Sequence, residues 1–132
     1  MTVTLTDNAL FRQQCYINGH WCDADDGATF TVTNPATDES LGTSPRMGEA
    51  ETRQAIDAAH GAFPAWRDMA AAQRAVFLEA WDDLMMEHQD DLGRLMTLEQ
   101  GKPLAEAKGE IAYAASFLKW FAEEARRAYG DT

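Results

Sequence analysis

The sequence predicts an α+β fold in which a small antiparallel sheet precedes about four helices. Over residues 15–43, short β-branched and aromatic runs alternate with turn signals, as is typical of strands. From residue 48 to about residue 129, apolar residues recur at the 3.6-residue spacing of helices. The chain has 132 residues and is 45% hydrophobic, so it is long enough for one ordinary domain with a core.

The strand region opens with the run CYINGHWC, in which Asn18-Gly19 separates two short apolar and aromatic segments. Both turn positions of a tight hairpin favour positive φ, and this pair is the strongest short-range hairpin signal. A further strand is predicted at Thr29–Thr33, where β-branched residues dominate. Asn34-Pro35 ends that strand, and a short extended piece is expected around Leu41–Thr43.

A first helix is expected after Gly48 and is predicted to end at Pro64, because proline removes a backbone donor and obstructs the preceding turn. A second helix is predicted from about residue 70 to residue 88, and a third from residue 89 to residue 100. Their apolar residues form stripes that are expected to face inward. These are Ala55, Ile56, Ala59 and Phe63, then Val76, Phe77, Ala80, Trp81, Leu84 and Met85, then Leu92, Leu95 and Met96.

The stretch LEQGKPLAEAKGE joins the third predicted helix to the last. Gly101 suits the position just past a helix end, and Pro103 suits the first position of the next helix. The last helix is expected to reach about Tyr129. Its apolar face requires a partner surface, either on the other helices or on sequence beyond Thr132. A phosphate-binding loop is excluded by the spacing. That motif needs glycine at position 96 and serine or threonine at position 103, where this sequence has Met96 and Pro103.

The charge balance excludes two classes of partner. The sequence has 22 acidic and 11 basic side chains, for a formal net charge of −11, which repels phosphate backbones and anionic lipid surfaces. We therefore expect neither nucleic acid nor a membrane as partner. No apolar stretch reaches transmembrane length, and the first residues lack the features of a signal peptide, so a cytoplasmic location is expected. Residues 1–10 are predicted to be a flexible tail with a short helical turn near Leu10.

Cys15, His20 and Cys22 are the candidates for metal binding or for a reactive thiol. Their spacing matches no standard zinc pattern, and acidic residues follow Cys22, which disfavours a thiolate. A hairpin would place the two cysteines face to face near its strand ends, so a packing role is favoured. The alternative is that His20 and Cys22 share one face of a strand and form a reactive pair. The sequence contains no G-x-G-x-x-G run for a dinucleotide.

An ordered series of motifs resembles the N-terminal segment of the aldehyde dehydrogenase superfamily: YINGHW, TVTNPATDESLGTSP, ETRQAIDAAHGAFPAWRDM, LMTLEQGKPLAEAKGEI and FLKWFAEEARRAYGDT. LMMEHQDDLGRLMTLEQGKPLAEAKGEIAYAASF and AEEARRAYGDT most resemble the NADP-preferring bacterial succinate-semialdehyde dehydrogenases. The resemblance covers about residues 10–132. It implies that residues 11–132 are the N-terminal part of an α/β enzyme domain, with a hairpin region at 15–43 and a helical region at 48–129, truncated before the cofactor-binding sheet.

The resemblance implies an NAD(P)-dependent oxidoreductase that converts succinate semialdehyde to succinate in 4-aminobutyrate degradation. In that family the catalytic cysteine, the general-base glutamate and the main cofactor contacts lie downstream of this segment. The chain is therefore expected to hold no catalytic or cofactor-binding residue, to bind neither NADP nor NAD by itself, and to be inactive alone. Its expected partner is the remainder of the polypeptide or a homologous subunit.

The resemblance also implies two sites within the chain. Family members hold a monovalent cation at positions matched here by the carbonyl groups of Val32 and Thr33 and the carboxylate of Glu99, which are hard oxygen ligands. Many relatives have aspartate where Glu99 stands, and a local cap or ion pair is the alternative for this residue. Tyr113 and Phe117 of the last helix are expected to line a substrate tunnel, with plain core packing as the alternative.

The residues alone leave a second interpretation open. The chain would then be a small helical protein-binding module, or a subunit of a split enzyme without catalysis of its own, that docks through its last helix. A self-sufficient domain unfolds cooperatively, whereas a dependent piece is molten and binds hydrophobic dye.

Overall fold

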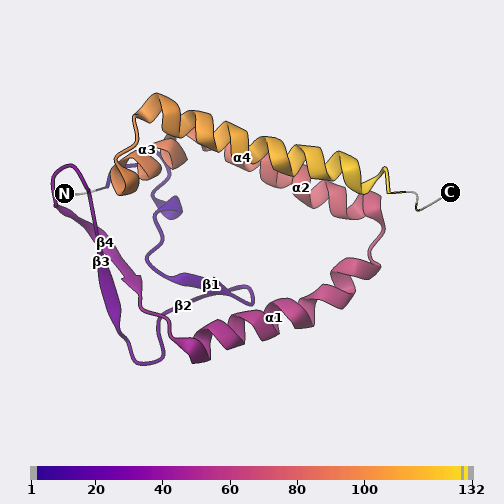
Figure 1. Ribbon diagram of the computed structural model, residues 1–132, viewed down its shortest axis with the longest axis horizontal. Helices are drawn as coiled ribbons and strands as arrows, with labels where there is room; N and C mark the ends of the chain where they lie inside the picture. Colours follow the sequence, from indigo (N-terminus) through magenta and orange to yellow (C-terminus); the bar gives the residue numbers. More distant parts are fainter. Residues whose placement is uncertain (1–2, 129, 131–132) are drawn as a thin grey trace.

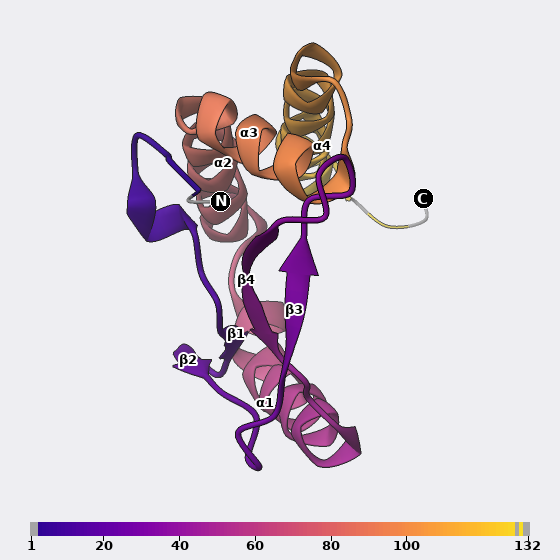
Figure 2. The ribbon, with the colours of Figure 1, turned by 90° about the vertical axis from the view of Figure 1, so that its left-hand side faces the viewer.

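The computed structural model describes residues 3–128 and 130. The elements of this part are a 3₁₀ turn η1 (Asn8–Leu10), strands β1 (Cys15–Ile17), β2 (His20–Cys22), β3 (Thr29–Thr33) and β4 (Ser40–Pro45), and helices α1 (Glu49–Asp68), α2 (Ala71–Glu87), α3 (Gln89–Gln100) and α4 (Leu104–Ala125). The predicted α+β organisation is confirmed. In Figure 1 the ribbon traces an open ring, with α2 and α4 side by side across from α1. Figure 2 shows β3 and β4 running between these two levels.

The strands form two separate two-stranded antiparallel sheets within the described residues, β1–β2 and β3–β4. The predicted hairpin turn is confirmed, because Asn18 and Gly19 have φ values of 50° and 82°. Strand β3 has the predicted bounds, and β4 is longer than the extended piece expected there. The register of the first hairpin pairs Tyr16 with Trp21, and their ring centroids lie 5.1 Å apart.

Helix α1 continues through Pro64 to Asp68, so the prediction that Pro64 ends the first helix is wrong. A proline inside a helix costs about 3 kcal/mol or more, since one backbone hydrogen bond is lost. Contacts made beyond the proline offset this cost. One of them joins α1 to α2, where the ring centroids of Trp66 and Phe77 lie 5.9 Å apart.

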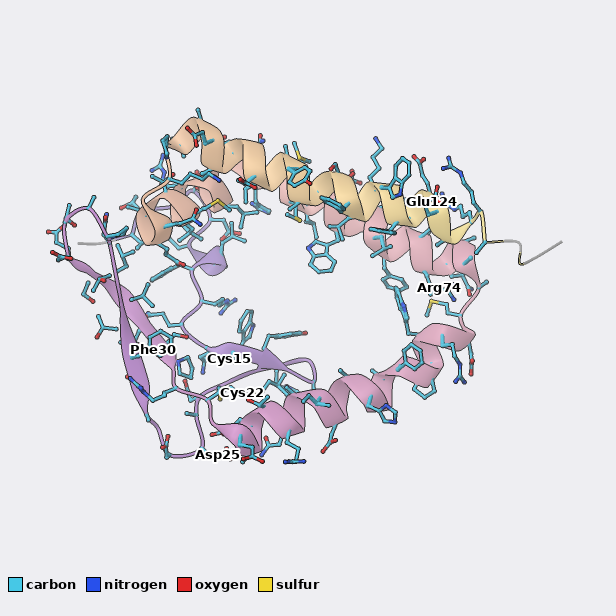
Figure 3. All side chains as sticks on the ribbon, in the orientation of Figure 1. Cys15, Cys22, Asp25, Phe30, Arg74 and Glu124 are labelled. Carbon is cyan, nitrogen blue, oxygen red and sulfur yellow. The ribbon has the colours of Figure 1, made fainter. Side chains whose placement is uncertain are left out.

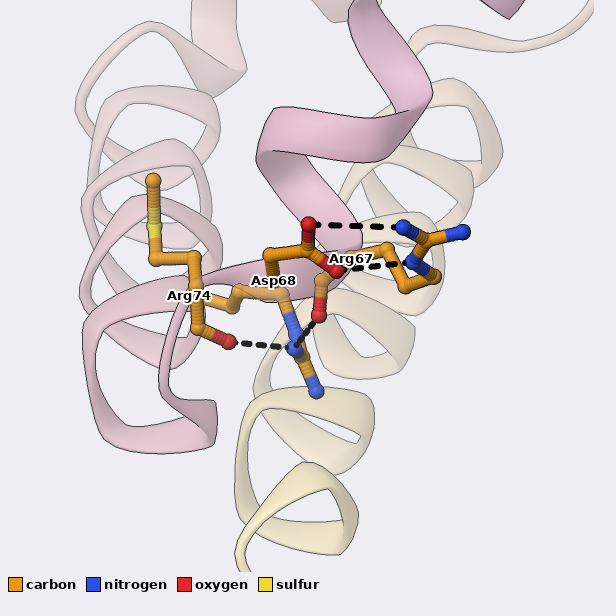
Figure 4. A network of polar contacts seen from close by, with 4 residues as sticks. Arg67, Asp68 and Arg74 are labelled. Carbon is orange, nitrogen blue, oxygen red and sulfur yellow. Dashed lines mark hydrogen bonds and ion pairs between the residues drawn. The ribbon is translucent and has the colours of Figure 1, made fainter.

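The turn between α1 and α2 is held by Arg74 (Figure 4). Its Nη1 atom donates to the carbonyl oxygen of Arg67 at 3.1 Å and to that of Met69 at 2.6 Å. Arg67 in turn forms an ion pair with Asp68 at 2.8 Å. Carbonyl groups at a helix end have no partner within the helix, so the Arg74 guanidinium satisfies them and fixes the path into α2.

The core of the helical part is a seam of small side chains between α2 and α4. Ala75, Ala107, Ala115 and Ala122 are each at most 1% exposed, and Ile111 is 7% exposed. Several larger residues on the predicted apolar faces of α1 and α2 do not contribute to this core. In the described part of the chain, more than half of the surface of each of these residues is exposed: Ile56, Phe63, Val76, Phe77, Trp81 and Leu84. The prediction that these residues face inward is therefore wrong.

Helix α3 begins and ends where predicted, and Gly101 follows it with φ of 78°. A Cβ atom on Gly101 would lie 3.1 Å from Cγ of Pro35, so the turn after β3 packs against the end of α3. Pro103 precedes the first residue of α4 instead of occupying it. Helix α4 ends at Ala125, short of the predicted end at Tyr129, which lies outside the described residues.

The segment before η1 is anchored on α3, unlike the flexible tail expected over residues 1–10. Both Asp91 carboxylate oxygens accept backbone N–H groups, from Thr6 at 2.9 Å and from Asp7 at 2.8 Å. Leu5 is 6% exposed. The predicted turn near Leu10 is present as η1, and residues 1 and 2 lie outside the described part. None of the described helices is long and apolar enough to span a membrane.

Candidate functional site

The structure brings the two halves of the expected cation site to one cavity of about 180 Å³. Val32 of β3, residues 42–44 of β4, Glu99 of α3 and residues 11–13 line it. An irregularity in the β3–β4 register lies between Val32 and Thr33. Such a bulge leaves one residue unpaired and disrupts the ladder beside the cavity. Thr33 adjoins Val32 in the strand but does not line the cavity.

Glu99 lies in the last turn of α3, and its side chain is exposed. It makes no hydrogen bond or ion pair with another residue of the described part, so the local pair considered as an alternative is not seen there. The end of a helix carries partial negative charge from its free carbonyl groups. A carboxylate at this end therefore favours a nearby cation.

Arg12 lines the same cavity and supplies a positive charge of its own. Its guanidinium carbon lies 5.0 Å from the ring centroid of Trp21, which directs it toward the hairpin. Among the other lining residues, Gln13 Oε1 accepts the backbone N–H of Thr43 at 2.7 Å. The lining residues carry hard oxygen atoms of the kind that bind monovalent cations, and Arg12 is the competing positive group.

Tyr113 and Phe117 lie one turn apart on α4, with ring centroids 4.9 Å apart and nearly perpendicular. They are 62% and 45% exposed, so core packing does not account for them within the described residues. Phe117 also lines an open pocket of about 350 Å³ together with Ser116, Trp120 and Phe121. These side chains therefore form an exposed aromatic surface on α4 that can pack against a neighbouring segment or ligand.

The hairpin residues Cys15, His20 and Cys22 are not grouped as metal ligands in the described part. No group of three His, Cys, Asp or Glu residues is placed to hold a metal ion in residues 3–128 and 130. Cys22 Sγ donates to the carbonyl oxygen of His20 at 3.6 Å. The two cysteines form no disulfide. In the strand register Cys15 lies directly opposite Cys22, as the hairpin prediction expected.

Two buried carboxylates, Glu51 and Asp91, hold neighbouring segments by accepting backbone hydrogen bonds. Backbone N–H donors lower the pKa of Glu51, namely its own and those of Asp25 and Gly48. Backbone donors at Thr6 and Asp7 likewise lower the pKa of Asp91. Glu51 stands three residues after Gly48, the capping-box spacing, which was the available signal. No short-range pattern connects Asp91 with residues 6 and 7.

Comparison with known proteins places these elements in a family context. The Aldehyde dehydrogenase family matches residues 21–132. A glutarate-semialdehyde dehydrogenase of Pseudomonas putida KT2440 is 68% identical over 97% of this chain and 27% of its own length. An NADP(+) succinate-semialdehyde dehydrogenase of Escherichia coli K12 is 66% identical over the same shares.

Solved structures agree with this context. The crystal structure of an E. coli NADP-dependent enzyme has a TM-score of 0.96 at 65% identity, over 98% of this chain and 27% of that one. A succinate-semialdehyde dehydrogenase from Burkholderia pseudomallei has a TM-score of 0.95 at 57% identity, over the same shares. The chain spans 27% of the length of the first curated relatives it matches.

Proposed function

This chain belongs to the aldehyde dehydrogenase family, and we propose that residues 11–132 form the N-terminal part of an NAD(P)-dependent semialdehyde dehydrogenase. The observation that carries the proposal is the 66–68% identity of nearly the whole chain to two semialdehyde dehydrogenases. The proposed substrate is succinate semialdehyde, oxidised to succinate. We place the reaction in 4-aminobutyrate degradation and in the cytoplasm.

Glutarate semialdehyde is the second candidate substrate, because the P. putida relative named for it is 68% identical to this chain. The two semialdehydes differ by one methylene group. One methylene in an apolar pocket is worth about 1–3 kcal/mol, or roughly 10- to 200-fold in kcat/KM. Their relative kcat/KM therefore distinguishes the candidates.

The chemical step is proposed to use groups outside this chain. The bound dinucleotide supplies the hydride acceptor for aldehyde oxidation. We propose that this chain makes no main contact with that cofactor, since its sequence has no G-x-G-x-x-G loop and its net negative charge opposes a phosphate-rich ligand. The proposed part played by this chain is support and covering of the site, with Tyr113 and Phe117 beside the substrate tunnel.

Exposed apolar side chains on α1, α2 and α4 support a partner that covers them. Phe63, Trp81, Trp120 and Phe121 are each more than half exposed in the described part. Monomeric proteins rarely leave large contiguous apolar patches exposed. We propose that the remainder of the polypeptide, or a homologous subunit, covers these faces. The rival is a protein-binding module that folds and acts without an attached catalytic domain.

A monovalent cation is proposed for the cavity between β3 and the end of α3. The support is that Val32 and Glu99 line one cavity, although they come from distant parts of the sequence. The cation would balance the Glu99 carboxylate beside the negative end of α3.

The experiment is a rate measurement on the natural protein purified from its source. Initial rates are measured with succinate semialdehyde and with glutarate semialdehyde, each with NADP and with NAD, and product acid is identified by mass spectrometry. We expect succinate formation with a kcat/KM at least about tenfold above that for glutarate semialdehyde. A reversed ratio selects the second candidate, and no oxidation of either contradicts the proposal. The 132-residue chain alone, assayed in parallel, is expected to be inactive.

A further inference from the structure

The β1–β2 hairpin carries two thiols directly opposite each other. Cys15 and Cys22 are Cα partners in the register, on neighbouring strands (Figure 3). Opposed residues of antiparallel strands have Cα atoms about 4.5–5.5 Å apart and side chains on the same face. Disulfides span Cα distances of about 4.4–6.8 Å. The backbone therefore already has the separation that a disulfide requires.

Both cysteines are free and half-buried, so an oxidant can reach them. The contact of Cys22 Sγ with the His20 carbonyl oxygen at 3.6 Å is weak and is easily exchanged for a covalent bond. The acidic residues after Cys22 do not block oxidation, because exchange also proceeds with ordinary thiols at a lower rate. Half-exposure and opposition distinguish this pair from two isolated buried cysteines.

The surrounding contacts hold the two strands in this register. The turn residues Asn18 and Gly19 adopt the positive φ of a tight hairpin. The Tyr16 and Trp21 rings contact each other across the strands, and Arg12 lies over the Trp21 ring at 5.0 Å. The thiols are thus preorganised, and closure of the second sulfur is intramolecular.

We propose that Cys15 and Cys22 form a reversible cross-strand disulfide when the protein meets a small disulfide oxidant such as oxidised glutathione. The thiolate of one cysteine attacks a glutathione sulfur, and the glutathione S–S bond breaks to release one glutathione thiolate. The second cysteine thiolate attacks the protein sulfur of the mixed disulfide and releases the second glutathione. Two protein thiols are oxidised, one glutathione disulfide is reduced, and the two protein protons end on the two glutathione thiols.

The disulfide would rigidify the hairpin that lies beside α1. The hairpin tip, residues 16–19, and the alanines at 55, 58, 59 and 62 of α1 line one shared pocket. Closing the eight-residue segment 15–22 limits the open states of the hairpin. We expect local opening of the hairpin to slow by about 10- to 100-fold, with the hairpin still packed on α1.

The test uses the intact natural polypeptide under native conditions. Protein is treated with oxidised glutathione, quenched with acid, alkylated and digested with trypsin. Residues 13–46 contain no internal lysine or arginine, so both cysteines fall in one tryptic peptide. We expect this peptide to lose two hydrogen atoms, to resist alkylation and to carry no glutathione. Dithiothreitol is expected to restore two alkylated cysteines, and hydrogen exchange of the same segment is expected to slow on oxidation.

Two variants provide controls. Cys22→Ser is expected to retain glutathione on Cys15, since no second thiol can displace it. The double variant Cys22→Ser, Asp23→Cys keeps two thiols but moves one by a single position, just past the end of β2 and out of register with Cys15. It is expected to keep its glutathione adducts. The proposal is overturned if the wild-type peptide retains two alkylatable thiols or stable adducts, or if the shifted pair closes as fast as the native pair.

Discussion

Two helical glycines allow the close approach of α3 and α4 to be measured. A Cβ atom on Gly93 of α3 would lie 2.9 Å from Lys108 Cγ and 3.3 Å from the Lys108 backbone nitrogen of α4. The same atom on Gly109 would meet nothing within 4 Å among the described residues. Each Gly→Ala change favours the helix by about 1 kcal/mol. Overpacking opposes this gain at Gly93 alone and costs about 1–3 kcal/mol.

Gly93→Ala is therefore expected to destabilise the protein by about 0–2 kcal/mol, and Gly109→Ala to stabilise it by about 1 kcal/mol. Subtracting the two effects cancels the helix propensity and leaves the steric cost of about 1–3 kcal/mol. The backbone nitrogen of Lys108 cannot turn aside as a side-chain tip can. Moreover, Gln89 Nε2 of α3 donates to the Lys108 carbonyl oxygen at 2.9 Å, which resists separation of the helices.

The assay is urea unfolding of both variants and the wild type, in the same polypeptide and at the same concentration. Unfolding free energies are compared at equal slopes, because a changed slope would mean a changed denatured or native state. Equal stabilisation by Gly93→Ala and Gly109→Ala would refute the close approach, since it would mean that α4 gives way at no cost.

Three further predictions concern the core, the buried carboxylates and the cavity. Ile111→Ala is expected to lower the unfolding free energy by about 2–5 kcal/mol in urea titration, and a loss under about 1 kcal/mol would contradict a core role. The pKa of Asp91 is lowered in the folded state from an ordinary value of 3.8, so its stabilising effect is present above that pH and is lost as pH falls through the folded pKa. The unfolding midpoint of Asp91→Asn should therefore fall less steeply than that of the wild type below about pH 4, whereas parallel curves would contradict this. Glu99→Gln is expected to abolish any dependence of the unfolding temperature on sodium or potassium at constant ionic strength, and an unchanged dependence would mean that Glu99 does not hold the cation.

Local rules succeed in this chain where neighbouring residues decide the conformation. The Asn18-Gly19 turn and the left-handed Gly101 are positions at which few residues accept positive φ, so their identity is informative. The prediction that Pro64 ends the first helix fails because long-range contacts outweigh the local effect. The cost of one internal proline is local, but the contacts of Trp66 and Arg67 that offset it depend on α2, whose position the local sequence does not specify.

The candidate site likewise depends on contacts between residues that are distant in the sequence. Val32 and Glu99 are 67 positions apart, and no spacing rule says that they line one cavity. Only the ordered family motifs suggested their association. The Asp91 contact with residues 6 and 7 is equally long-range, and the sequence showed only a carboxylate suited to a helix start.

The apolar stripes identify a face of a helix but not which members of that face meet a neighbour. Between α2 and α4 the alanines make the contact, so bulky residues on either side are displaced outward. Helix α1 is the extreme case, because it packs chiefly against the three-residue strand β1 and leaves Ile56 and Phe63 exposed. Most helical stability in proteins comes from packing of an apolar face, so α1 needs more contact than the described residues provide. This need is the physical argument for a covering polypeptide over α1. If the 132-residue chain unfolded cooperatively and bound no hydrophobic dye, the rival, self-sufficient module would be favoured instead.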